Sequence, residues 1–342
     1  MKRPPRALPF RSARGILVDG CMKILDRKRN IIMVYYLSNL PDGLIYGLLA
    51  MGIYISLRIL DIPDLTTEGS FGFGAVISVL ISLQGHPLLG LVAGLAAGVL
   101  AGAVTGLLQT KLSVHPVLAG IITMSGLYSI NLVCYSLTEK GATTNLSYNQ
   151  TTIFDTIKAI FGIKGQFPTT LVKASVSLLI AILLIVLVAL FFKTNLGLRI
   201  RATGDNPDMV RSSSINVDMT KIIALMLSNG LIGFAGALAS QSIGYSDINL
   251  CNGALIYGLA AVIIGEAIFG KRGVTIGLIS AVTGSVVYKL IVAFVVRMNL
   301  FGERSANLMK FTCALIVAIT LAIPAVKEKM AESKKRKAAR QC

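Results

Sequence analysis

Residues 88–110 read LLGLVAGLAAGVLAGAVTGLLQT, and this stretch decides the fold class. It contains no charged residue over a length that crosses the hydrocarbon core of a bilayer as a helix, which takes about 20 apolar residues. Glycine recurs at every fourth position, at Gly90, Gly94, Gly98, Gly102 and Gly106. This spacing places the five glycines on one helix face, where missing side chains let a second helix approach closely. We therefore predict a membrane-spanning helix that packs through these glycines.

The rest of the chain shares this apolar character. Of its 342 residues, 54% are hydrophobic and only 14% are charged, whereas a soluble domain carries about 25% charged residues. Blocks 70–84 and 254–269 are short, and the first is glycine-rich, so either is a candidate re-entrant segment. We expect an all-α integral membrane protein, a polytopic helical bundle of about 8–10 transmembrane segments with one or two short or re-entrant ones. The apolar blocks are 31–60, 70–84, 88–110, 116–137, 170–192, 221–244, 254–269, 274–296 and 311–326.

Positive charge is concentrated in the two ends of the chain. Residues 1–30 carry nine Lys or Arg against two Asp, and residues 327–342 carry seven against two Glu, so these ends hold +7 and +5 of the formal +17. Basic segments that flank apolar blocks are typical of the cytoplasmic side of a membrane and also bind anionic lipid. We therefore expect both ends in the cytoplasm, contact with the bilayer, and no nucleic-acid partner. The expected parts are a basic N-terminal extension over 1–30, a transmembrane domain over 31–326 and a basic tail over 327–342.

The side of each loop follows from that orientation. If block 31–60 crosses and block 70–84 does not, the acidic turn at 61–64 falls outside. The loop 138–168 then also falls outside, and the loop 193–221 falls inside. This inner loop contains Asn206, a candidate N-cap, followed by Pro207 at a first helical position and Asp208 in a first turn. We expect a short helix over 207–214 that serves as a docking element for a soluble partner, with a merely solvated loop as the alternative.

Two similar polar segments precede the short apolar blocks. Asp64-Leu65-Thr66-Thr67-Glu68-Gly69 precedes block 70–84, and Asp247-Ile248-Asn249-Leu250-Cys251-Asn252-Gly253 precedes block 254–269. Paired segments of this kind are typical of transporters built from two structural repeats, although shared composition alone also explains the likeness. No zinc-ligand spacing, catalytic triad or nucleotide-binding fingerprint occurs in the sequence, so we expect neither an enzyme nor a metal site.

The inner loop and the segments around it resemble a known family. Residues 199–216, 221–230, 233–238, 258–266 and 64–70 are similar to permease subunits of bacterial ABC importers, in the superfamily of the branched-chain amino acid and ribose importer permeases. The likeness is greatest to the subgroup described as tryptophan/tyrosine-type or uncharacterised permeases, and it covers about 40–326. The run Ser212-Ser213-Ser214 lacks a glycine that members often have there, which leaves the end of the short helix open.

The resemblance implies a function and partners. The chain would be the permease subunit of an importer in the bacterial cytoplasmic (inner) membrane that moves a small solute inward. The expected solute is an amino acid, and aromatic amino acids are among the candidates. A cytoplasmic ABC ATPase would hold the ATP and magnesium, so this chain itself would need no cofactor. An extracytoplasmic binding protein and a second permease copy, giving a homodimer, would complete the complex. The alternative is a secondary transporter or channel that works without an ATPase.

The resemblance and the broken segments together give candidate site residues. The ATPase-coupling surface implied by the family is Gly204, Asp205, Asn206, Met209 and Arg211. A substrate path is expected near the bilayer midplane, where interrupted segments expose backbone to a cavity. Its candidate residues are Thr66, Thr67, Glu68, Ser70, Phe71, Asn249 and Asn252.

Overall fold

The computed structural model describes residues 35–137, 143–146, 152–162, 166–270, 273–297 and 318. The first helix, Tyr35–Ile59, ends in the π-helical turn η1 (Ile55–Ile59). Seven helices of the described part are long and apolar enough to cross a membrane, and α2 is a shorter apolar helix. The chain is therefore an all-α, multi-pass membrane protein, as predicted, while block 311–326, apart from residue 318, and both basic ends lie outside the described residues. The further elements are α2 (Thr67–Leu83), α3 (Pro87–Thr110), α4 (Pro116–Ser136), β1 (Thr143–Asn145), α5 (Ile153–Phe161), α6 (Gln166–Phe191), α7 (Asn195–Asp205), α8 (Pro207–Ser212), α9 (Val217–Ile243), β2 (Tyr245–Asp247), the 3₁₀ turn η2 (Ile248–Cys251), α10 (Ala254–Phe269) and α11 (Val274–Arg297).

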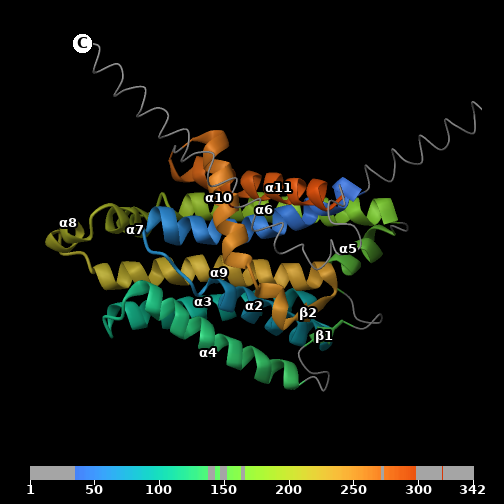
Figure 1. Ribbon diagram of the computed structural model, residues 1–342, viewed down its shortest axis with the longest axis horizontal. Helices are drawn as coiled ribbons and strands as arrows, with labels where there is room; N and C mark the ends of the chain where they lie inside the picture. The colour runs from blue at the N-terminus through green and yellow to red at the C-terminus, as the bar shows by residue number, and fades with distance from the viewer. Residues whose placement is uncertain are drawn as a thin grey trace, which may run out of the picture.

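The bundle has two distinct ends, set by helix α9. The short helices α7 and α8 precede α9, and β2 follows it, so they are separated by the length of a 27-residue helix, about 40 Å. We call these the α8 end and the β end of the bundle (Figure 1). At the β end, β1 pairs with β2 in antiparallel register, with Thr144 opposite Ser246.

Helix α5 lies at the β end and is fixed by its own polar residues. Thr152 and Asp155 form a reciprocal capping box at its N-terminus, and Lys158 pairs with Asp155 at 2.8 Å. Burial raises the pKa of Asp155, but the hydrogen bonds from Lys158 and Thr152 outweigh it, so this pKa lies below its usual value. The sequence analysis expected no helix in this loop, because nine residues are too few to show a transmembrane signal.

Glycine makes the central contact of the bundle. The predicted packing face of α3 lies against α9 and α2. A Cβ added to Gly98 would overlap the carbonyl oxygen of Asn229 in α9, and one added to Gly90 would lie 2.7 Å from the carbonyl oxygen of Ser78 in α2. Gly94 and Gly106 meet α9 in the same way, at 2.5 Å from Ala237 Cβ and 3.0 Å from Ile222 Cα, and Gly102 meets the Leu225 carbonyl. The backbones of three helices therefore approach one another along this face, and larger side chains would separate them.

One part of the predicted topology is wrong. The first helix ends at the α8 end, because a Cβ on Gly204 of α7 would overlap the Ile59 carbonyl, and it begins near the end of α11, where Tyr35 Oη donates to the Ala293 carbonyl at 3.1 Å. The acidic turn at 61–64 therefore leads from the α8 end into the middle of the bundle, and it does not lie on the side opposite the loop 193–221 as expected. The difference arises from α2. This helix brings the chain back to the β end, so helices α3 to α9 still run in the predicted directions. The side occupied by residues 1–30 lies outside the described residues.

Helices α2 and α10 both begin inside the bundle. Asp64, just before α2, accepts a hydrogen bond from Asn229 Nδ2, close to the middle of α9, and the last turn of α2 contacts Gln241 through Ser82. Helix α2 thus occupies only the half of the bundle toward the β end. Helix α10 begins beside it, since the N–H of Gly253 donates to Glu68, and ends at the α8 end. These two short helices are the segments that the sequence singled out.

Candidate functional site

Helices α7 and α8 form the exposed element of the α8 end. The Asn206 side chain caps α8 by accepting from the backbone N–H groups of Asp208 and Met209, at 3.1 and 3.0 Å. Val210 is 1% exposed and anchors the helix, whereas Met209 is 55% exposed. The buried valine and the exposed methionine give α8 one face that packs against the bundle and one apolar face that is open to solvent. Such a face is suited to a partner, because a lone helix this short is marginal without packing.

The structure refines the predicted helix in this loop. Helix α8 ends at Ser212, two residues before the expected end, and Ser214 has a left-handed backbone with φ of 59°. The preceding residues form α7, a helix that the sequence analysis did not expect. Its N-cap, Thr194, accepts from the Gly197 N–H at 3.4 Å, and this Thr-x-x-Gly signal was too weak to identify a helix of 11 residues. The candidate coupling residues are thus split between two helices, Gly204 and Asp205 in α7 and Met209 and Arg211 in α8, with Asn206 between them.

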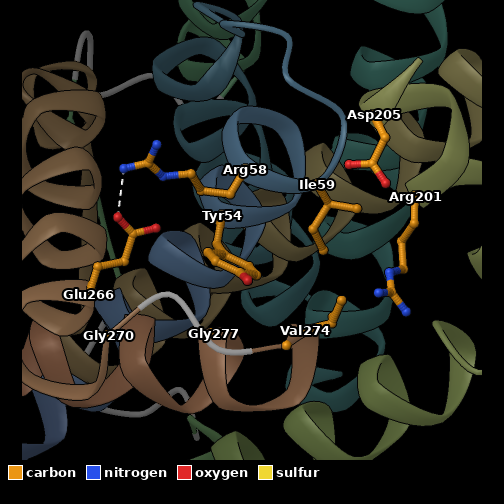
Figure 2. Close-up of a pocket in the computed structure, with 10 residues that line it drawn as sticks. Tyr54, Arg58, Ile59, Arg201, Asp205, Glu266, Gly270, Val274 and Gly277 are labelled. Atoms are coloured by element: carbon orange, nitrogen blue, oxygen red, sulfur yellow. Dashed lines mark hydrogen bonds and ion pairs between the residues drawn. The ribbon is translucent and has the colours of Figure 1, made fainter. Parts of the chain in front are cut away.

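Helix α7 is fixed to the first helix on one side and borders a cavity on the other. Gly204 lies directly on the Ile59 carbonyl, so no side chain fits between α7 and η1. The cavity has a volume of about 260 Å³ and lies at the α8 end, between the first helix, α7, α10 and α11 (Figure 2). Its lining residues come from four elements and are Tyr54, Arg58, Ile59, Arg201, Asp205, Glu266, Gly270, Gly273, Val274 and Gly277.

An ion pair closes one side of this cavity. Arg58 of η1 contacts Glu266 in the last turn of α10 at 2.6 Å, and the two side chains are 35% and 12% exposed (Figure 2). The structure thus pairs Glu266 with a residue 208 positions away in the sequence. The pair joins the end of the first helix to the end of α10. Movement at η1 is therefore connected to α10.

The candidate substrate-path residues of the first polar segment are engaged within the bundle. Thr66, Thr67, Ser70 and Phe71 are fully buried. Thr66 bonds to Thr105 of α3 at 2.8 Å, and Ser70 donates to Asn229 of α9 at 2.6 Å. These side chains therefore face neighbouring helices in the described part of the chain.

The two polar segments meet in space. Glu68 Oε1 accepts the N–H of Gly253 at 2.9 Å, so a carboxylate of the first segment caps the helix that follows the second. Asn249 and Asn252 of the second segment are exposed and bonded to each other at 3.2 Å. The two segments thus come together through Glu68 and the backbone of Gly253, which is not among the candidate residues. The contact agrees with paired units, and the repeat itself stays a prediction.

An aromatic group lies next to this contact. The Tyr46 ring of the first helix lies between Phe71 of α2 and Tyr257 of α10, with ring centroids 5.5 and 4.7 Å apart. Tyr257 also meets Tyr288 of α11 at 4.6 Å and bonds to Ser285. The sequence suggested Phe71 as a path residue, but it gave no sign of Tyr46, which lies in a long, evenly apolar helix.

Comparison with known proteins establishes the class to which this membrane fold and exposed loop belong. A family model described as the permease component of branched-chain amino acid transport systems matches residues 35–323. The chain belongs to this family of ABC-type transport permeases. No solved structure matches the chain.

Individual relatives transport different solutes according to their names. A tyrosine transport system permease protein of Clostridioides difficile is 32% identical over 283 residues, which are 82% of this chain and 89% of the relative. A probable branched-chain amino acid transport permease of Methanocaldococcus jannaschii is 26% identical over 61% of this chain and 59% of its own length. A galactose/methyl galactoside import permease of Haemophilus influenzae is 26% identical over 76% and 78% of the two chains. Membership in the family therefore fixes the class and leaves the solute open.

Proposed function

We propose that the chain is the membrane-spanning subunit of an ABC importer that moves an amino acid inward, driven by a separate cytoplasmic ATPase that docks on α7 and α8. The observation that carries this proposal is the exposed Met209 face of a capped helix that is anchored by Val210 and joined to η1 through Gly204. An element that is exposed to a partner on one side and packed without a gap on the other transmits force. ATP and magnesium would be held by the partner chain.

The charges of the loops support a cytoplasmic α8 end. Cytoplasmic loops are enriched in Lys and Arg. At the α8 end the described loops and the helix ends beside them carry Lys111, Lys193, Arg199, Arg201, Arg211 and Lys221. We propose that this end faces the ATPase, and that the β end receives substrate from an extracytoplasmic binding protein. In this proposal the second permease copy is identical, the membrane is the bacterial inner membrane, and the C-terminal basic tail is cytoplasmic.

The amino acid is proposed from the relatives. The tyrosine permease matches a larger share of the chain, and at higher sequence identity, than the branched-chain amino acid and galactose permeases named above do. The aromatic group of Phe71, Tyr46 and Tyr257 beside buried polar residues gives an environment that suits an apolar or aromatic side chain.

The test of ATPase coupling uses a matched pair of exposed methionines. Met209 of α8 and Met219 of α9 lie near the same end and are 55% and 56% exposed. With the full complex purified from its own cells, Met209→Glu is expected to lose most of the co-purifying ATPase, while Met219→Glu keeps it. Equal retention in both variants would place the docking surface elsewhere.

The test of the energy source separates the importer from its alternative. Cells that express the chain are expected to lose amino-acid uptake when ATP is depleted while the proton gradient is maintained. Uptake that continues under those conditions would contradict the proposal and favour a secondary transporter or a channel.

A further inference from the structure

Three buried side-chain oxygens of the described residues have no hydrogen-bond partner, and one of them belongs to Asn131. Asn131 of α4 is 3% exposed, and its Oδ1 is bonded to nothing in the described part of the chain. A buried acceptor left unpaired costs about 1–3 kcal/mol. A group with this cost is a candidate for binding a ligand that carries a donor.

Asn131 faces the place where the two polar segments meet. A Cβ added to Gly72 of α2 would lie 3.1 Å from Asn131 Nδ2 and 3.3 Å from Cys251 Sγ of η2. Gly72 follows Glu68 by one helical turn and so lies on the same face of α2. The amide of Asn131 therefore lies about one helical turn of α2 from Glu68, whose carboxylate holds the start of α10.

These polar groups include both an acceptor and donors that make no hydrogen bond of their own in the described part of the chain. Glu68 uses Oε1 to accept from Gly253, and its Oε2 makes no hydrogen bond within the described residues. The first intrahelical bond of α10 runs from Tyr257 N to the Gly253 carbonyl at 3.0 Å, so the N–H groups at 254–256 have no partner inside the helix. A helix N-terminus of this kind attracts a carboxylate, and a carboxylate beside an amide oxygen attracts an ammonium.

We infer that Asn131, Glu68 and the N-terminus of α10 form a transient binding site for the α-amino and α-carboxyl groups of an amino acid during transport. The ammonium donates to Asn131 Oδ1 and Glu68, and the carboxylate accepts from the first turn of α10. The side chain is directed to Tyr46, Phe71 and Tyr257. This inference rests on the proposed function, and it adds Asn131 as the residue that distinguishes an amino acid from a solute without an ammonium group.

In this structure Glu68 is still bonded to the start of α10, so the site is closed. The contacts at the two ends of α10 indicate how it opens. Glu68 holds Gly253, and Arg58 holds the opposite end of α10 at Glu266. Helix α10 has 16 residues, a length of about 24 Å, and connects these two contacts. Displacement of η1 by α7 would therefore move the start of α10 away from Glu68 and expose both groups to the solute.

The test measures binding to the permease directly, because uptake in an importer also reports the binding protein. The purified full chain in detergent is heated with L-tyrosine, L-leucine, N-acetyl-L-tyrosine or D-galactose. We expect an amino acid to raise the unfolding temperature, and the N-acetyl derivative, which lacks the ammonium, to have no effect. Asn131→Leu should weaken the apparent affinity for the amino acid at least about tenfold, the effect of losing one hydrogen bond to a charged group.

The control is a second buried amide. Gln109 of α3 also has an amide with unpaired atoms, so Gln109→Leu removes a comparable group elsewhere and should keep the response to amino acids. If Asn131→Leu does not fold, Glu68→Gln provides the same comparison. An equal response in Asn131→Leu and wild type, an effect of N-acetyl-L-tyrosine equal to that of L-tyrosine, or stabilisation by D-galactose alone would overturn the inference. ATP-dependent amino-acid uptake in cells, measured alongside, would show that the proposed function stands even then.

Discussion

The contact between α3 and α9 makes a graded prediction for three glycines. At Gly98 an added Cβ would overlap the Asn229 carbonyl, at Gly106 it would lie 3.0 Å from the Ile222 Cα, and at Gly126 of α4 it would meet nothing within 4 Å. Replacing glycine by alanine within a helix stabilises it by about 0.5–1 kcal/mol. Overpacking a close contact costs about 1–3 kcal/mol. The three substitutions therefore share one gain and differ in their steric cost.

The expected free energies of unfolding follow from these two terms. Gly126→Ala should be about 0.5–1 kcal/mol more stable than wild type, and Gly106→Ala close to wild type. Gly98→Ala should be about 1–2 kcal/mol less stable, because the backbone carbonyl cannot rotate away without breaking the helix. The assay is unfolding of the purified protein in mixed micelles with increasing SDS. If Gly98→Ala and Gly126→Ala unfold at the same SDS fraction, the close approach of α3 and α9 is refuted.

Three further predictions concern the polar contacts. Arg58→Glu and Glu266→Arg alone should each destabilise the protein by about 2 kcal/mol, below the about 3–5 kcal/mol of a fully buried pair, and the double exchange should restore most of it in the same SDS assay. Asn206→Ala should cost α8 about 1 kcal/mol of local stability, seen as faster amide exchange at 207–212 with α9 unchanged. Because the pKa of Asp155 is lowered, its stabilisation of α5 is present above the usual carboxyl pKa of about 4 and is lost as the pH falls through the lowered pKa. Amide-exchange protection over 153–159, relative to the intrinsic exchange rate at the same pH, should fall there, and Asp155→Asn should lose this pH dependence.

The local features of the fold were predictable from the sequence, and the long-range ones were not. The glycines of α3 share a face by simple helical geometry, and the cap and proline of α8 act within four residues, so both patterns are visible in the chain. The partner of Glu266 lies 208 residues away, and nothing in its neighbourhood points to Arg58. Asn131 likewise carries no sequence signal, since a single asparagine in an apolar helix has the same neighbours whether its amide is paired or not.

The error in the topology has a definite physical origin. Hydropathy measures the length of an apolar block and cannot tell where in the bilayer the block begins. Helix α2 has 17 residues and starts at the level of Asn229, so it returns the chain to the β end without crossing the full bundle. Counting it as a segment that stays on one side reversed the direction assigned to the first helix, while leaving that of α3 to α9 unchanged.

The interior starts of α2 and α10 explain why the bundle tolerates acidic residues that have no basic partner in the described part of the chain. The N–H groups at the start of a helix carry partial positive charge and need acceptors, and no water is present at the bilayer midplane to supply them. Asp64 accepts the Thr66 N–H at 2.9 Å at the start of α2, and Glu68 does the same for Gly253 at the start of α10. Each carboxylate thus satisfies a helix terminus that would otherwise be costly.

The two carboxylates differ in how firmly they are held, because Asp64 uses both oxygens, the second on Asn229, whereas Glu68 uses one. Asp64→Asn should therefore lower the stability of the whole protein, while Glu68→Gln should leave stability nearer wild type and act on transport; the reverse order in SDS unfolding would show that Glu68 serves only as a cap.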